Sequence, residues 1–249
     1  MKIALTFDIE RDLPNVLDTY NGIKNGLPKI LDILDTYDIQ GTFFFTGSIA
    51  NKFPNYVRLV EKKSHEVACH SLNHRRLRQM NLKECEEMIS ENKKILEEIC
   101  VRSTIIGFRA PYLKSHEFLI KILHNLGFKY DSSIKSNHKV DMNELNSYSI
   151  REFQPLDISL RMPFGYSILK RWILKNQVTI LYFHPLDIID TKNLMVKQKS
   201  KLNLFRDYLL RPDRWIKTGE MFIKRFNKFI QYALTKNAEF VTLRDMINE

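Results

Sequence analysis

The feature of this 249-residue chain that most restricts its fold is the alternation of short apolar runs with longer amphipathic segments. Residues 2–7 (KIALTF), 41–47 (GTFFFTG) and 178–183 (VTILYF) are rich in β-branched and aromatic residues, which favours strands. The segments between such runs have apolar residues at helical spacing. Strand–helix alternation without a Pro/Gly/Ser-rich linker predicts a single α/β domain, residues 1–249, with parallel strands in an irregular, barrel-like arrangement rather than an open sheet.

The expected elements extend along nearly the whole chain. Between residues 137 and 175 the pattern is less regular, and this region is compatible with a hairpin or an insertion. Helices are expected over residues 25–37, around 54–63, over 82–99, 116–127 and 219–234. Further strands are expected over residues 66–69, 104–108, 127–130 and 239–243.

Polar side chains of the types used in catalysis and metal binding follow five of the expected strands. In parallel α/β architectures the carboxyl ends of the strands meet at one rim, where active sites form. Core packing does not explain why five strands each deliver a charged, histidine or phenolic residue to that rim. We therefore predict a site built from Asp8 and Glu10, His70 and His74, Arg109 and Tyr112, Asp131, and His184.

The pair His70 and His74 is the feature most typical of a metal site. Residues four apart on a helical turn share a face, so two imidazoles can reach one cation. The alternative is one buried, hydrogen-bonded histidine beside an exposed one. A carboxylate from a neighbouring strand end favours the metal site, because two imidazoles and a carboxylate are a common ligand set for catalytic zinc. Such an ion lowers the pKa of bound water from ~15.7 to roughly 7.

Three acids, Asp8, Glu10 and Asp12, lie within five positions at the end of the first expected strand. Side chains at positions i and i+2 of a strand share a side, whereas adjacent ones face opposite sides. Asp8 and Glu10 are therefore expected to face the cavity while Ile9 packs behind them. Asp12 lies beyond the strand, and we expect it to be solvated.

The formal net charge of +10 favours either a lysine-rich solvated surface or attraction to anionic partners. No motif with groove-reading residues is present, so nucleic acid is not an expected partner. Cys69, Cys85 and Cys100 form no C-x-x-C pair, which indicates a reducing compartment and thiols that act as small buried hydrophobes.

The first residues of the chain and one basic segment bear on where in the cell the protein is expected. The first residues reach acids after a few apolar positions, unlike a secretory signal, and no apolar run is long enough to span a bilayer. We expect a cytoplasmic protein, with peripheral contact at the inner membrane face as an alternative. Residues 197–219 mix basic and apolar side chains, so they either touch a membrane surface or a phosphate group, or cover the barrel with a basic face in water.

Five short motifs in order resemble those of the polysaccharide deacetylase family, also known as NodB-homology or carbohydrate esterase family 4 proteins. They are TFD (6–8), HEVACHSLNH (65–74), GFRAPY (107–112), GFKYDSSI (127–134) and LYFHP (181–185), and the similarity extends to GTFFFTG (41–47) and FVTLRDM (240–246). The resemblance implies an irregular (β/α) barrel, often of seven strands, and a metal-dependent hydrolase of carbon–nitrogen amide bonds that removes N-acyl groups, usually acetyl, from amino sugars.

The resemblance also implies roles for individual residues. His70 and His74 match the metal-binding histidines, and Arg109 matches the arginine that keeps the catalytic acid ionised. Tyr112 lies in the segment whose backbone N–H helps to hold the oxyanion, and His184 matches the histidine that protonates the leaving amine. Asp131 either orients His184 or bonds to Ser133 and nearby backbone in a turn, because the family's Asp-x-x-Asp-Trp pattern is incomplete here.

The first motif departs most from the family, which has two adjacent aspartates where this chain has Asp8 and Ile9. Our hypothesis is Asp8 as the general base and Glu10 as the third metal ligand; the reverse assignment stays open. Zinc is the expected cation, with cobalt, nickel and iron as alternatives.

The expected substrate is an N-acylated amino sugar, including one linked to a nucleotide or a lipid phosphate. Removal of a formyl or acetyl group from a lipid-linked sugar at the membrane surface is one alternative. The others are a related amidohydrolase acting on a non-sugar amide and a non-catalytic sugar-binding relative.

Overall fold

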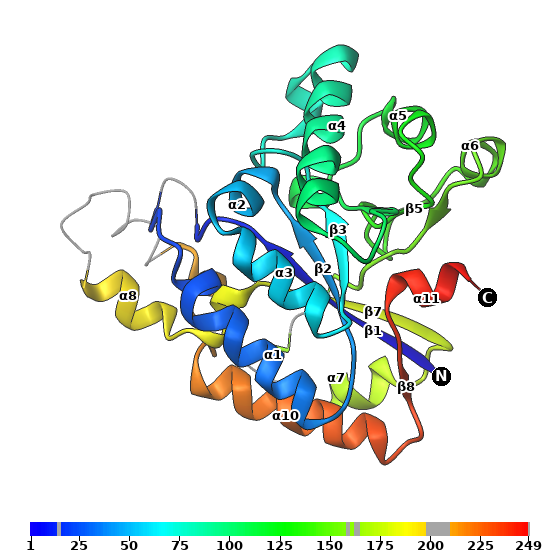
Figure 1. Cartoon of the computed structure of the whole chain (residues 1–249). Helices are drawn as coiled ribbons and strands as arrows, with labels where there is room; N and C mark the ends of the chain where they lie inside the picture. Colours follow the sequence, from blue (N-terminus) through cyan, green and yellow to red (C-terminus); the bar gives the residue numbers. More distant parts are fainter. Residues whose placement is uncertain (14–15, 158–159, 162–164, 198–209, 249) are drawn as a thin grey trace.

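Parallel strands form the centre of the molecule (Figure 1), in a computed structural model that describes all residues except 14–15, 158–159, 162–164, 198–209 and 249. Seven strands, hydrogen-bonded in the order β6-β5-β4-β3-β2-β1-β7, form a curled half-barrel, and β8 pairs with the start of β1. The strands are β1 (Lys2–Ile9), β2 (Thr42–Phe45), β3 (Glu66–Cys69), β4 (Gly107–Phe108), β5 (Tyr130–Asp131), β6 (Arg151–Glu152), β7 (Val178–Phe183) and β8 (Glu239–Phe240).

One hydrogen bond links the two ends of the strand path. The N–H of Leu156, shortly after β6, donates to the carbonyl oxygen of Ile180 in β7 at 2.9 Å. The backbone N–H of Glu239 donates to the carbonyl of Met1 at 3.0 Å, so the chain's first residue lies beside the start of β8. In Figure 1 both termini accordingly lie on the side where the strands begin, which leaves the carboxyl ends of the strands free for the site.

Helices surround the strands (Figure 1). Their apolar faces pack on the sheet. The longest of them, α4, begins with a capping box in which Asn81 and Glu84 bind each other's backbone N–H groups. The helices are α1 (Leu27–Thr36), α2 (Gly47–Lys52), α3 (Pro54–Lys62), α4 (Leu82–Ile99), α5 (Leu119–Asn125), α6 (Met142–Ser147), α7 (Tyr166–Ile173), α8 (Thr191–Lys197), α10 (Glu220–Leu234) and α11 (Leu243–Ile247). Short helical turns are η1 (Gly22–Gly26), η2 (Leu77–Gln79), η3 (Pro111–Leu113), η4 (Pro185–Ile188) and η5 (Pro212–Arg214).

The strand alternation separates two apolar cores. Odd-numbered residues of β1, such as Leu5 and Phe7, belong to the large core between the strands and the helices. Ala4 belongs instead to a small core inside the curl, together with residues of the other strands such as Phe44 and Ala68. Because strand side chains alternate, the series that begins at Ala4 continues inside the curl towards the carboxyl end of β1.

The region between residues 137 and 175 corrects one expectation. Its described part contains α6, the parallel strand β6 and α7, and β6 joins β5 in parallel, so the described residues of this region form no hairpin. A strand of two residues gives no alternation long enough to be recognised in a sequence. The expected strand over residues 104–108 shortens in the same way, to Gly107–Phe108.

The remaining expectations concern cysteines and membranes. Cys69, Cys85 and Cys100 are buried and free, as expected. Within the described ranges, no helix combines the length and apolarity needed to cross a bilayer. Of the basic and apolar stretch 197–219, residues 198–209 lie outside the described residues.

Candidate active site

The inward-facing side of β1 delivers a polar series to the carboxyl end of the strands. Thr6 and Asp8 are buried and both accept hydrogen bonds from the Nη1 atom of Arg109, at 2.8 Å each. Ile9 packs in the outer apolar core, whereas Asp8 and Glu10 line the same hollow. The period of two along the strand therefore explains how two acids separated by an isoleucine reach one site.

Arg109, which follows β4, is fully buried and is held on every side. Its Nε donates to the carbonyl of Ser132 at 3.1 Å, its Nη2 donates to the Ser132 hydroxyl at 2.8 Å, and the guanidinium lies over the Phe44 ring at 4.1 Å. Burial alone would raise the pKa of Asp8, but the charge and hydrogen bond of Arg109, together with His70 and His184, hold that pKa below its ordinary value. The pair thus keeps a buried carboxylate ionised.

Glu10, His70 and His74 form the one group among the described residues whose ligand atoms all lie within 4.8 Å of one another. The Nε2 atom of His70 is 3.9 Å from Glu10 Oε2, and the Nε2 atom of His74 contacts the same oxygen. Burial would raise the pKa of Glu10, but the three nearby histidines, His74 first, hold it below its ordinary value.

The protonation states in this cluster suit a cation. His70 Nδ1 lies 2.8 Å from the carbonyl oxygen of Arg109, and donation there leaves Nε2 with its lone pair directed at Glu10. Burial lowers the pKa of His70 to about 4, so the imidazole is neutral at neutral pH, as a metal ligand must be. Apart from its contact with His74 Nε2, the buried Glu10 Oε2 has no hydrogen-bond partner among the described residues, and the buried His74 Nδ1 has none. Two imidazoles and a buried carboxylate fit a divalent cation.

The segment that joins the two histidines corrects the reasoning that paired them. It is a loop rather than a helical turn: Ser71 and His74 have left-handed φ angles of 61° and 57°. Asn92 of α4 holds this loop, because its Nδ2 donates to the carbonyls of Ser71 at 2.6 Å and Phe45 at 3.0 Å. A reversal of the backbone, fixed from α4, brings the imidazoles together.

His184 follows β7 and completes a group of three histidines around Glu10. Its Nε2 lies 3.5 Å from Glu10 Oε1, and its side chain is 37% exposed. The backbone N–H of His184 donates to Asp187 at 3.0 Å, and η4 follows directly. A Cβ on Gly26 would lie 2.1 Å from the Pro185 carbonyl oxygen, so only glycine allows η1 to approach this turn so closely.

Tyr112 lies in η3 in a left-handed conformation, with φ 63°, and its side chain is partly exposed. The centre of its ring is 4.5 Å from that of His74. The residue after Arg109 is held as well, since the N–H of Ala110 donates to the Ser133 hydroxyl at 2.7 Å. The turn that carries Tyr112 is thus fixed beside the His74 imidazole.

The described hydrogen bonds of Asp131 do not include His184. Its Oδ1 accepts hydrogen bonds from the Ser132 N–H at 2.9 Å and from the Ser133 hydroxyl. These are the serines that hold Arg109 and Ala110, so Asp131 supports the Arg109 side of the site. Two roles were expected for Asp131, orienting His184 or bonding to Ser133 and nearby backbone in a turn. Its contacts match the second.

The expectation that Asp12 is solvated is wrong. Asp12 is buried, and its carboxylate accepts hydrogen bonds from the Thr19 hydroxyl at 2.8 Å and from the Gly22 N–H at 3.1 Å. These partners come from a loop that folds back and pairs Asp12 with Thr19. The third acid therefore fixes the loop after β1.

Sequence reasoning missed three residues that hold the site: Thr6, Ser132 and Ser133. Thr6 could have been found, because it lies two positions before Asp8 on the same side of a strand. The serines directly follow Asp131, and short polar side chains at the end of a buried strand were a weaker signal. Arg161 was also missed; its Nε lies 3.1 Å from Asp187, the residue that binds the His184 backbone.

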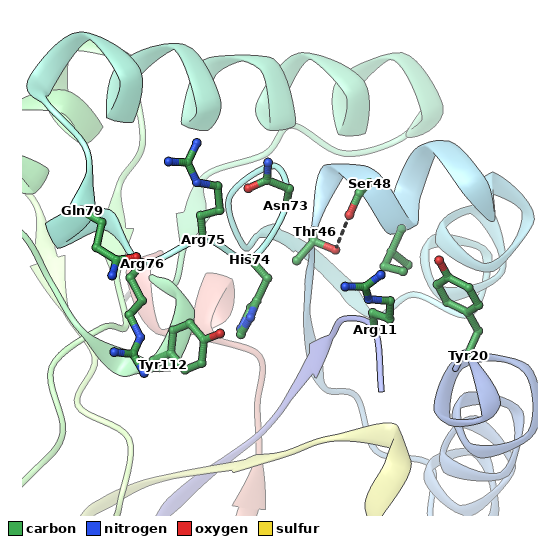
Figure 2. Close-up of a pocket in the computed structure, with 11 residues that line it drawn as sticks. Arg11, Tyr20, Thr46, Ser48, Asn73, His74, Arg75, Arg76, Gln79 and Tyr112 are labelled. Atoms are coloured by element: carbon green, nitrogen blue, oxygen red, sulfur yellow. Dashed lines mark hydrogen bonds between the residues drawn. The ribbon is translucent and has the colours of Figure 1, made fainter. Parts of the chain in front are cut away.

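Two of the hollows beside the cluster of Glu10, His70 and His74 share part of their lining. One, of about 370 Å³, is lined by Asp8, Glu10, His74, Tyr112 and His184 among others. The second, of about 450 Å³, shares His74 and Tyr112 with the first and extends towards Arg11, Arg75 and Arg76 (Figure 2). A substrate that reaches the cluster therefore has space on both sides of His74 and Tyr112.

Comparisons with known proteins agree with the motifs. The family model described as polysaccharide deacetylase matches residues 1–130. A chitooligosaccharide deacetylase of Azorhizobium caulinodans is 29% identical over 102 residues, which are 41% of this chain and 49% of that protein. A peptidoglycan-N-acetylglucosamine deacetylase of Bacillus cereus is 34% identical over 98 residues, 39% of this chain and 32% of that protein. The chain thus matches less than half the length of each of these relatives.

Solved structures show the same fold. The crystal structure of a peptidoglycan N-acetylglucosamine deacetylase matches 98% of this chain and 87% of its own with a TM-score of 0.62 at 22% identity. A pseudoenzyme of carbohydrate esterase family 4 from Bacillus anthracis matches 99% of this chain and 65% of its own with a TM-score of 0.62 at 12% identity. The predicted (β/α) barrel of this family is confirmed. Because the fold also occurs in a pseudoenzyme, activity must be argued from the side chains.

Proposed function

The chain belongs to the polysaccharide deacetylase family, and we propose from this premise that it is a metal-dependent hydrolase that removes an N-acetyl group from an amino sugar. The observation that carries the proposal is the cluster of Glu10, His70 and His74. An ionised Asp8–Arg109 pair and His184 lie beside it. A relative that only binds sugar has no use for this set of acid–base groups.

The proposed metal ligands are the Nε2 atoms of His70 and His74 and the Glu10 carboxylate. A divalent cation such as zinc, when bound there, would polarise the acyl carbonyl and lower the pKa of a water molecule from about 15.7 to roughly 7. The Nδ1 bond of His70 to the Arg109 carbonyl orients one imidazole for this task. The ligand positions are thus built by the ends of β1 and β3.

Asp8 is the proposed general base. Arg109 holds its Oδ1, which leaves the other carboxylate oxygen to accept a proton from the attacking water. The water oxygen bonds to the acyl carbon, and the backbone N–H of Tyr112 is the proposed donor to the carbonyl oxygen as that oxygen gains charge. A donor of this kind is typically worth about 3 kcal/mol in the transition state.

His184 is the proposed general acid. As the carbon–nitrogen bond breaks, its imidazole donates a proton to the amine nitrogen, so the products are acetate and a free amino sugar. An imidazole is suited to this step near neutral pH. The partial exposure of His184 and its place in the hollow with Asp8 and Glu10 support the assignment.

The test is acetate release by the zinc-loaded protein from a panel of N-acetylated sugars, with His184→Gln as the matched variant. We expect the wild-type protein to release acetate and His184→Gln to lose about 100-fold or more of kcat while it keeps its zinc. Zinc-loaded protein that binds sugars without releasing acetate would instead be a binding relative. Hydrolysis of a small cyclic amide, with no activity on any sugar, would overturn the substrate class.

A further inference from the structure

The hollow of about 450 Å³ beside the metal-binding cluster has an unusual charge. Its walls carry the guanidinium groups of Arg11, Arg75 and Arg76, and none of the described residues that line it is acidic. We call this hollow the arginine pocket. In Figure 2, His74 lies between Arg11 on one side and Arg75 and Arg76 on the other. Three cations around one cavity whose described lining has no acidic residue favour an anionic occupant.

The contacts of these arginines leave their charges largely unneutralised. Arg11 is 3.5 Å from Asp18, and both side chains are more than 40% exposed, so this pair is weak. The Arg76 guanidinium lies over the Tyr112 ring at 4.9 Å, which orients it without cancelling its charge. Arg75 makes no ion pair or hydrogen bond with any other described residue.

The hollow on the other side of His74 and Tyr112 provides the contrast. The basic side chains of Lys135, Arg211 and Arg214 line it too, but so do the carboxylates of Asp8, Glu10 and Asp213. Its charges are balanced by the protein itself. The arginine pocket is therefore distinguished by the lack of acidic side chains in its described lining and not only by the basic composition of the chain.

We propose that the arginine pocket binds a phosphate group of the substrate, so that the substrates are phosphorylated N-acyl amino sugars. This inference rests on the proposed function. His74 and Tyr112 line both hollows, so one ligand can place its acyl group at the metal ligands and its phosphate among the arginines.

Phosphate suits this geometry better than carboxylate. A carboxylate offers two oxygens, which one guanidinium can occupy in a bidentate pair. A phosphate or diphosphate offers more acceptor oxygens, and guanidinium groups on opposite walls can bind it together. The polar side chains of Ser48, Asn73 and Gln79 also line the pocket and supply further donors.

The first experiment measures binding without catalysis. Inorganic pyrophosphate is titrated into the zinc-loaded protein by calorimetry, with the double variant Arg75→Gln/Arg76→Gln. The control is Arg78→Gln/Lys83→Gln, which removes the same charge from exposed positions outside the pocket. Zinc itself attracts phosphate, but both variants keep Glu10, His70 and His74, so the comparison isolates the arginines. We expect Arg75→Gln/Arg76→Gln to weaken binding at least about tenfold and the control to stay within about twofold of wild type.

The second experiment identifies the source of the phosphate. Acetate release is compared for N-acetylglucosamine 1-phosphate, UDP-N-acetylglucosamine and the neutral N,N′-diacetylchitobiose. We expect a higher kcat/KM for at least one phosphorylated sugar, and Arg75→Gln/Arg76→Gln should lower its ratio to the neutral sugar at least about tenfold. A preference for the monoester or for the diphosphate supports the proposal and tells which phosphate is bound.

Several results would overturn the proposal. Equal weakening by the control variant would mean that the general positive field binds pyrophosphate. A preference for the carboxylate-bearing N-acetylmuramic acid, or for the neutral sugar, would reject phosphate as the ligand. The proposed reaction and the proposed phosphate site can fail independently. Unchanged pyrophosphate binding by Arg75→Gln/Arg76→Gln, with normal acetate release, rejects only the phosphate site. Arginine-dependent binding without hydrolysis of any sugar removes only the proposed reaction.

Discussion

At the end of β1, three acidic side chains within five positions meet three different environments. Asp8 shares a buried ion pair with Arg109, Glu10 lies among three histidines, and Asp12 accepts hydrogen bonds from a loop. The partners, and not the acids, create the difference, since all three are carboxylates within one short stretch. Their proposed roles are therefore open to substitution by the isosteric amides.

Asp8→Asn and Glu10→Gln separate the base from the metal ligand with the same change of charge. Glu10→Gln should lower zinc affinity by more than the roughly 10- to 100-fold typical of removing a residue that merely supports a ligand. Asp8→Asn should keep zinc and lose acetate release, because the amide accepts no proton. Zinc affinity is measured by competition with a chelator. If Asp8→Asn empties the site while Glu10→Gln keeps it filled, the two roles are exchanged.

At the scale of residues, the sequence predicts which side chains face the site better than it predicts the partners that they bind. The strand period places Asp8 and Glu10 together because it depends only on local geometry. The solvated Asp12 was a wrong expectation because its partners, Thr19 and Gly22, come from a loop whose path no local rule specifies. Arg75 and Arg76 follow His74 directly, yet nothing in the sequence tells which cavity they line.

At the scale of elements, α4 supports the loop that joins His70 and His74, two of the proposed metal ligands. Its single asparagine, Asn92, is fully buried and donates to the carbonyls of Phe45 and Ser71 at the ends of β2 and β3. The same amide lies 3.1 Å from Cys69 Sγ. One side chain thus joins the helix to the segment between His70 and His74.

Replacing Asn92 tests whether this support reaches the ligands. Asn92→Leu removes the donors while roughly keeping the volume, and we expect a loss of about 1–3 kcal/mol in the free energy of unfolding. Zinc affinity should fall about tenfold, because the loop that carries His74 loses its anchor. Asn125→Leu, on the exposed side of α5, is the control and should change neither quantity appreciably. A loss of stability with unchanged zinc affinity would limit α4 to a role in folding.

The elements themselves were predicted according to their length. The 18 residues of α4 have a clear helical period, and the six residues of β7 have a clear apolar run, so both were recognised. β4, β5 and β6 have two residues each, and tertiary pairing alone defines them. The expected helical turn between His70 and His74 is wrong for a related reason. Left-handed residues form a loop there, and the spacing of two histidines in a sequence is the same for a loop as for a helix.

At the scale of the whole molecule, the interior of the curled sheet holds more buried acids than buried bases. Burial raises the pKa of Glu66, of Asp131 and of Glu152, and the negative charge of Asp131 raises that of Glu152 further. Arg109 is fully buried there, but its hydrogen bonds go to Asp8, Thr6 and Ser132. The folded protein therefore holds protons that the unfolded chain releases.

The sign of the resulting pH dependence follows from Asp131, whose pKa is raised by burial from 3.8 to about 6. A raised carboxyl pKa contributes stability that is present at pH below the unfolded value and lost as pH rises through about 6. Asn at position 131 keeps an oxygen for Ser132 and Ser133 and adds a donor for Glu152. Between about pH 5 and about pH 7.5, wild type should lose about 1 kcal/mol more of its free energy of unfolding than Asp131→Asn, measured by urea denaturation. Asp32→Asn, an exposed change on α1, should behave as wild type. Parallel curves for wild type and Asp131→Asn would mean that Asp131 is ionised throughout this range, and that Arg109 neutralises both Asp8 and Asp131.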